Sequence, residues 1–140
     1  MMNVRCIFVI LVIAGCVYGD LSEDHREARK QRLDKCRKEM GITEENPLSR
    51  PPNLDDPKEK CFYACLMKES GKLVDGKMVA EKVLSAEKKR RPNYNDDIEA
   101  KLTYCVETAN EQSDECEMAA TMKKCTFEKL GPLPPRKRQQ

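Results

Sequence analysis

Apolar residues recur along this chain at the spacing of an α-helix, in segments separated by proline, glycine and capping residues. The clearest segment follows Asn95, whose side chain can cap a helix N-terminus, and Asp96 and Asp97 favour that end electrostatically. Its apolar positions lie three or four residues apart and would share one helical face: Ile98, Leu102, Cys105, Val106 and Ala109. No segment alternates convincingly as a strand does. The pattern predicts an all-α fold of about six helices.

Capping and breaking residues divide the rest of the chain into further predicted helices. Proline removes a backbone donor and restricts the residue before it, so at most a short helix fits before Pro47. Asp75-Gly76 predicts a tight turn. The other helices are predicted to begin near Ser22, at Asp55-Asp56-Pro57, near Lys77 and at Ser113-Asp114-Glu115, and to end at Gly41, at Ser70-Gly71, before Pro92 and at Gly131-Pro132.

The N-terminal apolar run has the order of a secretory signal peptide. Arg5 precedes an apolar core at residues 6–14, and small residues end the segment at Gly19. The run is shorter than the roughly 20 residues that a transmembrane helix needs. Residues 13–16 also resemble a bacterial lipoprotein box with Cys16 as the lipidated residue, but we prefer simple secretion and predict a signal peptide over residues 1–19.

Composition limits what the remaining chain can be. Charged residues make up 36% of the sequence, aromatic residues 5%, and tryptophan is absent, so one small domain with a thin core is expected, over residues 20–131. Residues 132–140 are proline-rich and basic and are expected to be a disordered tail. The formal net charge of +2 argues against nucleic acid as a partner.

Eight cysteines in 140 residues indicate a secreted protein stabilised by disulfides. Two of them lie in the predicted signal peptide, which leaves six. Cys61 and Cys65 lie four residues apart on one predicted helix, where the side chains are poorly placed to bond each other. Cys116 and Cys125 are separated by the same argument if both lie on the last helix. Several of the 15 pairings possible for six cysteines remain open.

The cysteine gaps resemble those of the insect odorant-binding protein family, which includes the pheromone-binding proteins. The similarity lies in three residues between the second and third cysteines and eight between the fifth and sixth, together with the signal peptide and helical spacing. The resemblance implies about six helices held by three interlocked disulfides around an apolar cavity that carries small hydrophobic molecules. The implied pairs are Cys36–Cys65, Cys61–Cys116 and Cys105–Cys125.

A carrier of this kind needs a dry cavity with apolar lining and few polar groups. The candidate ligand-binding residues are the apolar positions of the predicted helices and turn, although core packing would produce the same pattern: Leu33, Met40, Phe62, Leu66, Leu73, Val74, Met78, Val83, Leu84, Ile98, Leu102, Val106, Met118, Met122 and Phe127. The methionines are flexible and suit varied apolar ligands.

The polar candidates are expected to lie at the surface. Tyr63, Tyr94 and Tyr104 are predicted to be half-exposed, and the only histidine, His25, to be solvated. The run Lys88-Lys89-Arg90-Arg91 is predicted to be a solvated surface segment. The sequence contains none of the nucleophile-elbow, zinc-helix or phosphate-loop motifs, so we expect no enzyme, no cofactor and no metal.

These observations favour a secreted carrier of odorants or pheromones. A membrane receptor is a further expected partner, and the oligomeric state is expected to be a monomer or a weak homodimer. The first alternative keeps the fold but places the protein in venom, saliva or reproductive secretion. The second is a disulfide-stabilised protein, such as an inhibitor or toxin, that acts through its surface.

Overall fold

The computed structural model describes residues 23–134. The predicted signal peptide, the Ser22 helix cap and residues 135–140 of the predicted tail lie outside the described residues. The chain divides into two compact units, Met1–Lys35 and Cys36–Gln140. Described residues of the first unit are helical from residue 23, and the helical assignment continues to residue 39. The prediction of a single domain over residues 20–131 stays a prediction.

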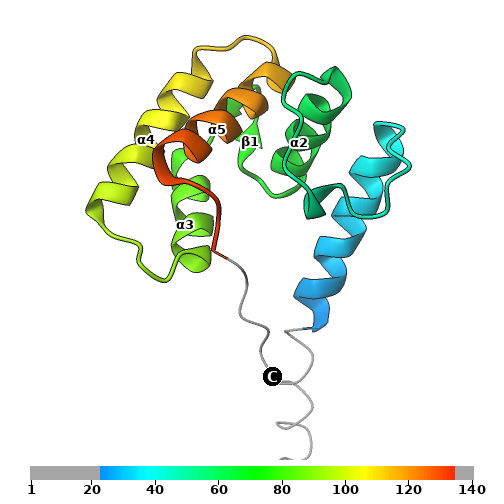
Figure 1. Cartoon of the computed structure of the whole chain (residues 1–140), viewed down its shortest axis with the longest axis horizontal. Helices are drawn as coiled ribbons and strands as arrows, with labels where there is room; N and C mark the ends of the chain where they lie inside the picture. The colour runs from blue at the N-terminus through cyan, green and yellow to red at the C-terminus, as the bar shows by residue number, and fades with distance from the viewer. Residues whose placement is uncertain (1–22, 135–140) are drawn as a thin grey trace, which may run out of the picture. The chain divides into compact units, whose positions relative to one another are not determined.

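The second unit is mostly helical, as predicted, with one small hairpin (Figure 1). Helical capping follows the predicted residues closely. Asp56 accepts a hydrogen bond from the backbone N–H of Lys58, and Asn95 accepts one from that of Ile98. The elements in chain order are the 3-10 helix η1 (Pro47–Ser49), α2 (Pro57–Glu69), β1 (Leu73–Val74), β2 (Lys77–Met78), α3 (Ala80–Arg90), α4 (Asp96–Asn110) and α5 (Glu115–Leu130).

The hairpin corrects the prediction that a helix begins near Lys77. The turn at Asp75 and Gly76 has positive φ angles of 51° and 72°, which is the geometry that joins two antiparallel strands tightly. Leu73 pairs with Met78 across the hairpin. Residues 77 and 78 are therefore strand, and α3 begins only at Ala80. Two-residue strands are too short for the sequence pattern to reveal.

Asn110 joins this hairpin to the end of α4. Its side-chain carbonyl accepts a hydrogen bond of 2.7 Å from the backbone N–H of Met78, and its amide group donates to the Met78 carbonyl at 3.2 Å. Lys77 adds a hydrogen bond from its ammonium group to the backbone carbonyl of Asn110. The side-chain amide of Asn110 thus pairs with both backbone polar groups of Met78. Leaving these groups buried without partners would cost free energy.

Helix α5 packs against both α2 and α4, and α3 packs against α4. The apolar face predicted for α4 is buried at all five positions. The largest side chains without solvent exposure include Phe62, Leu102 and Met118, which come from α2, α4 and α5. The core of the second unit is therefore built where these three helices meet.

Three disulfides fasten the second unit, and they are the pairs that the family resemblance implies. Cys61–Cys116 joins α2 to α5. Cys105–Cys125 joins α4 to α5. Cys36–Cys65 joins the helical turn at residues 36–39 to α2. Helix α5 is thus bonded covalently to two neighbours.

Candidate functional site

The predicted ligand-binding residues divide into three groups by exposure. Nine are buried in the second unit: Phe62, Leu73, Met78, Val83, Ile98, Leu102, Val106, Met118 and Met122. Four are half-buried: Leu33, Met40, Leu66 and Leu84. Two are exposed, Val74 at 47% and Phe127 at 62%. These exposures are those of a packed core as much as of a cavity wall, so the assignment of these residues to a cavity stays a prediction.

The exposure of Val74 and Phe127 corrects their assignment to the interior. On α5 the buried positions Met118, Met122 and Cys125 follow helical spacing. Phe127 lies two residues beyond Cys125, about 200° around the helix, and so faces away from the core. Val74 occupies the outward side of its two-residue strand, because neighbouring strand residues point to opposite faces. In both cases an apolar side chain lies on the solvent-facing side of its helix or strand.

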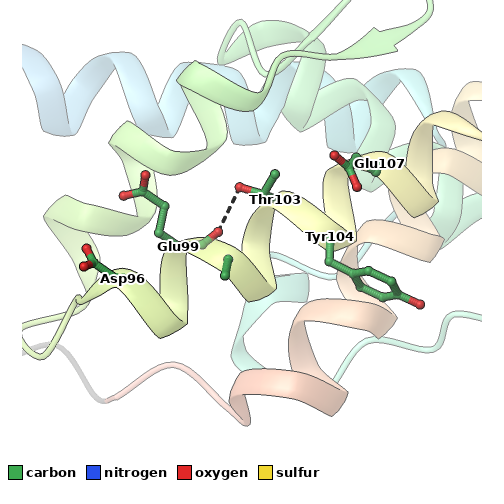
Figure 2. A pocket seen from close by; sticks show the side chains of 6 residues that line it. Asp96, Glu99, Thr103, Tyr104 and Glu107 are labelled. Carbon is green, nitrogen blue, oxygen red and sulfur yellow. Dashed lines mark hydrogen bonds between the residues drawn. The ribbon is translucent and has the colours of Figure 1, made fainter.

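An open surface depression of about 410 Å³ lies along one face of α4. Figure 2 shows the side chains that line it, with the ring of Tyr104 directed away from the carboxylates of Asp96 and Glu99. The Thr103 hydroxyl donates a hydrogen bond to the backbone carbonyl of Glu99 at 2.9 Å. All lining residues come from this single helix, and Glu107 adds a third carboxylate. The acidic lining of this depression does not suit an apolar ligand.

A second depression, of about 500 Å³, lies on the helix at the start of the described chain. Charged residues line it: Glu23, Asp24, Arg26, Glu27 and Lys30. None of the predicted ligand-binding residues lines either depression. Nine of those residues lie instead in the interior of the second unit, and the polar groups there decide what chemistry it offers.

Tyr63 on α2 is buried, only 3% exposed, which corrects the prediction that it is half-exposed. Its ring contacts that of Phe62 edge to face, with the centroids 5.5 Å apart. The ammonium group of Lys123, on α5, lies 4.5 Å from the centre of the Tyr63 ring. Burial raises the pKa of the Tyr63 hydroxyl, and the charge of Glu59 adds to this effect. Tyr63 is therefore an un-ionised ring that attracts a cation.

Lys123 is half-buried and its charge is destabilised. Loss of solvent is the largest cause that lowers its pKa, to about 8, and the positive charges of Arg90 and Lys72 act in the same direction. Glu87 opposes the shift. Among the described residues, Lys123 has no hydrogen bond or ion pair, and its one polar contact is the Tyr63 ring. A lysine in this environment is a candidate functional group.

The basic run at the end of α3 is only partly solvated, which corrects the prediction for Arg91. Lys88, Lys89 and Arg90 are exposed, whereas Arg91 is 5% exposed. The Arg91 Nε donates to the carboxylate of Glu87 at 2.9 Å, and Glu87 is also buried. One of the two terminal nitrogens of Arg91, Nη2, is buried with no hydrogen-bond partner. This guanidinium is therefore partly unsatisfied within the protein.

Comparison with known proteins places the chain by its sequence. The PBP/GOBP family model matches residues 19–129. The chain belongs to the PBP/GOBP family. The general odorant-binding protein 56a of Drosophila melanogaster is 28% identical over 131 residues, which cover 91% of this chain and 89% of the relative. No solved structure gives a significant match.

Sequence reasoning placed Tyr63 and Arg91 of this PBP/GOBP protein at the surface, and it singled out neither Glu59 nor Lys123. The Glu59 carboxylate is 6% exposed, pairs with Arg50 and accepts a hydrogen bond from the backbone N–H of Asn53 at 2.7 Å. A signal existed only for Arg91, because Glu87 precedes it by four residues, the spacing of helical ion pairs. The burial of Tyr63, Glu59 and Lys123 depends on contacts with residues outside their own helices.

Two other kinds of feature, a metal site and a membrane-spanning helix, are absent from the described part of this PBP/GOBP chain. Residues 23–134 contain no group of histidine, cysteine or acidic side chains arranged to hold a metal ion. Over the same residues, no helix combines the length and apolar character needed to cross a membrane.

Proposed function

We propose that this protein is a secreted carrier that binds small hydrophobic molecules, odorants or pheromones, in an internal cavity and transports them through aqueous lymph. The match of the PBP/GOBP family model to residues 19–129 is the observation that carries the proposal. The general odorant-binding protein similar to this chain adds support. Secretion is supported by the disulfide framework, since such bonds persist in oxidising compartments.

The proposed ligand contacts are the buried apolar side chains between α2, α4 and α5. Phe62, Leu102, Met118 and Met122 lie there. Methionine adapts its shape to different apolar surfaces, so these two methionines suit a site that opens around its ligand. A membrane receptor is the proposed second partner, and the proposed oligomeric state is a monomer or weak homodimer.

Binding of a neutral fluorescent probe, N-phenyl-1-naphthylamine, to the secreted protein tests the carrier function. We expect saturable binding at micromolar probe concentration, and displacement by volatile alcohols and esters. Met122→Ala is expected to change the probe affinity several-fold, because it reshapes the buried interior. Phe127→Ala, on the exposed side of the same helix, is the matched control and should leave the affinity unchanged. Absence of saturable binding by the folded, oxidised protein would contradict the proposal.

A further inference from the structure

Positive charge gathers around one half-buried side chain, Lys123. Its ammonium group lies over the face of the Tyr63 ring, which turns it toward α2. The positive charges of Lys72 and Arg90 act on it from outside α5. Lys123 has no hydrogen bond or ion pair within the described chain, so the Tyr63 ring and the more distant charge of Glu87 are what compensate its partial desolvation.

The nearby carboxylate does not neutralise this cluster. Glu87 is the acidic group that acts on Lys123, but it is already shared between two arginines. The Arg90 Nη1 lies 3.4 Å from one of its oxygens and the Arg91 Nε lies 2.9 Å from the other. Arg91 Nη2 remains buried without a hydrogen-bond partner. Glu87 is therefore already engaged by two arginines and forms no ion pair with Lys123.

We propose that Lys123 binds the carboxylate head group of an amphipathic ligand whose alkyl chain lies among the buried apolar side chains. The proposal rests on the proposed carrier function and narrows its ligand class. A carboxylate beside Lys123 would form a charge-assisted hydrogen bond and give this lysine the ion pair that it lacks among the described residues. Arg90 and Lys72 add attraction through the positive potential that they create at Lys123.

The neighbours of Lys123 fit the rest of such a ligand. Phe62 and Tyr63 contact each other on α2, and Phe62 has no solvent exposure. Met122 precedes Lys123 on α5 and is 5% exposed. A head group at Lys123 would thus lie where the polar cluster at the end of α3 meets the apolar core, with its alkyl chain toward Phe62 and Met122.

Displacement of N-phenyl-1-naphthylamine by two ligands of equal chain length tests this inference. Dodecanoate carries the carboxylate, and dodecan-1-ol does not. For the wild-type protein at pH 7, we expect dodecanoate to bind about tenfold more tightly than the alcohol, as one charge-assisted hydrogen bond would give. Lys123→Met, which keeps the side-chain length without the charge, should remove this preference and leave the alcohol affinity unchanged.

Two further variants isolate the charge at this position. Lys124→Met removes the adjacent, exposed lysine of the same helix and should keep the preference for dodecanoate. Lys123→Arg restores a cation and should restore most of the preference. Circular dichroism of each variant confirms that the helices are intact.

The outcomes separate this inference from the carrier function. If the probe binds but the wild-type protein prefers neither ligand, the carboxylate assignment is wrong while the carrier function stands. Equal losses of both ligands in Lys123→Met would also overturn it, because a structural lysine would act in this way. If the probe itself does not bind the wild-type protein, both proposals fail.

Discussion

The buried ion pair between Glu87 and Arg91, at the C-terminal end of α3, provides a stability test. Glu87→Gln removes the carboxylate but leaves the guanidinium of Arg91, which is 5% exposed and joined to that carboxylate at 2.9 Å. A glutamine of similar shape can still accept one hydrogen bond, but it cannot neutralise the charge. Breaking a buried pair by removing one partner typically costs about 3–5 kcal/mol. We expect a loss of this size, which is a large part of the total stability of a small domain.

A second ion pair with the same helical spacing is the control. Lys101 and Asp97 lie four residues apart on α4, and the Lys101 Nζ is 2.6 Å from the Asp97 Oδ2. Their side chains are 40% and 70% exposed. Lys101→Met should therefore cost about 0.5 kcal/mol or less. The double variant Glu87→Gln/Arg91→Met removes both buried charges, and we expect it to recover more than half of the loss caused by Glu87→Gln alone.

Urea unfolding followed by circular dichroism at 222 nm, with the disulfides oxidised, measures these differences. With a typical slope of about 1.5 kcal/mol per molar urea, Glu87→Gln should lower the midpoint by about 2–3 M. A shift no larger than that of Lys101→Met would refute the claim that burial strengthens this pair. Failure of the double variant to recover stability would show that packing, and not an unpaired charge, causes the loss.

Three further predictions concern other parts of the second unit. Leu102→Ala, at a position without exposure, should lower the free energy of unfolding by about 2–5 kcal/mol, whereas Phe127→Ala should lower it by about 0.5 kcal/mol or less. Thermal melting compares the two variants, and equal losses would contradict the exposed position assigned to Phe127. Replacing both cysteines of Cys61–Cys116, which are 55 residues apart, by alanine should cost about 4 kcal/mol in urea unfolding; a loss under 1 kcal/mol would show that this bond constrains little. Folding lowers the pKa of Lys123 from 10.5 to about 8, so between these values the unfolded chain holds a proton that the folded protein has released, and stability should rise with pH by up to about 3 kcal/mol. Lys123→Met should be more stable than the wild type at pH 7 and lose that advantage by pH 10; a constant difference would argue against the lowered pKa.

Local sequence signals predict the helices well because each signal acts within one turn. Asn95 and Asp56 cap helices where the sequence indicates, and α4 buries all five positions of its predicted face. The hairpin escapes prediction because its strands are two residues long and Asn110, more than 30 residues away, completes their hydrogen bonding. Its turn was predictable, since Asp75-Gly76 favours positive φ angles.

The interior was less predictable than the helices because burial depends on where elements meet. Phe127 has an apolar side chain on the exposed side of α5, and a count of apolar residues assigns it wrongly. Tyr63 and Lys123 come together from α2 and α5, at a sequence distance that no periodic pattern connects. The disulfide pairing illustrates the same limit, because geometry left several pairings open and the family resemblance supplied the one present.

The distribution of cysteines over the helices also determines where the native protein can open locally. Every α-helix of the second unit except α3 contains a bonded cysteine. When α2, α4 or α5 unfolds locally, a disulfide still holds it to a neighbouring segment and restrains its separation. Helix α3 has no such restraint and can separate while all three bonds stay intact. Amide hydrogens of Ala80–Arg90 are therefore expected to exchange with solvent through the lowest-energy openings of this unit. The buried pair of Glu87 and Arg91 lies within the last turn of this helix, so the same openings would expose both charges to water.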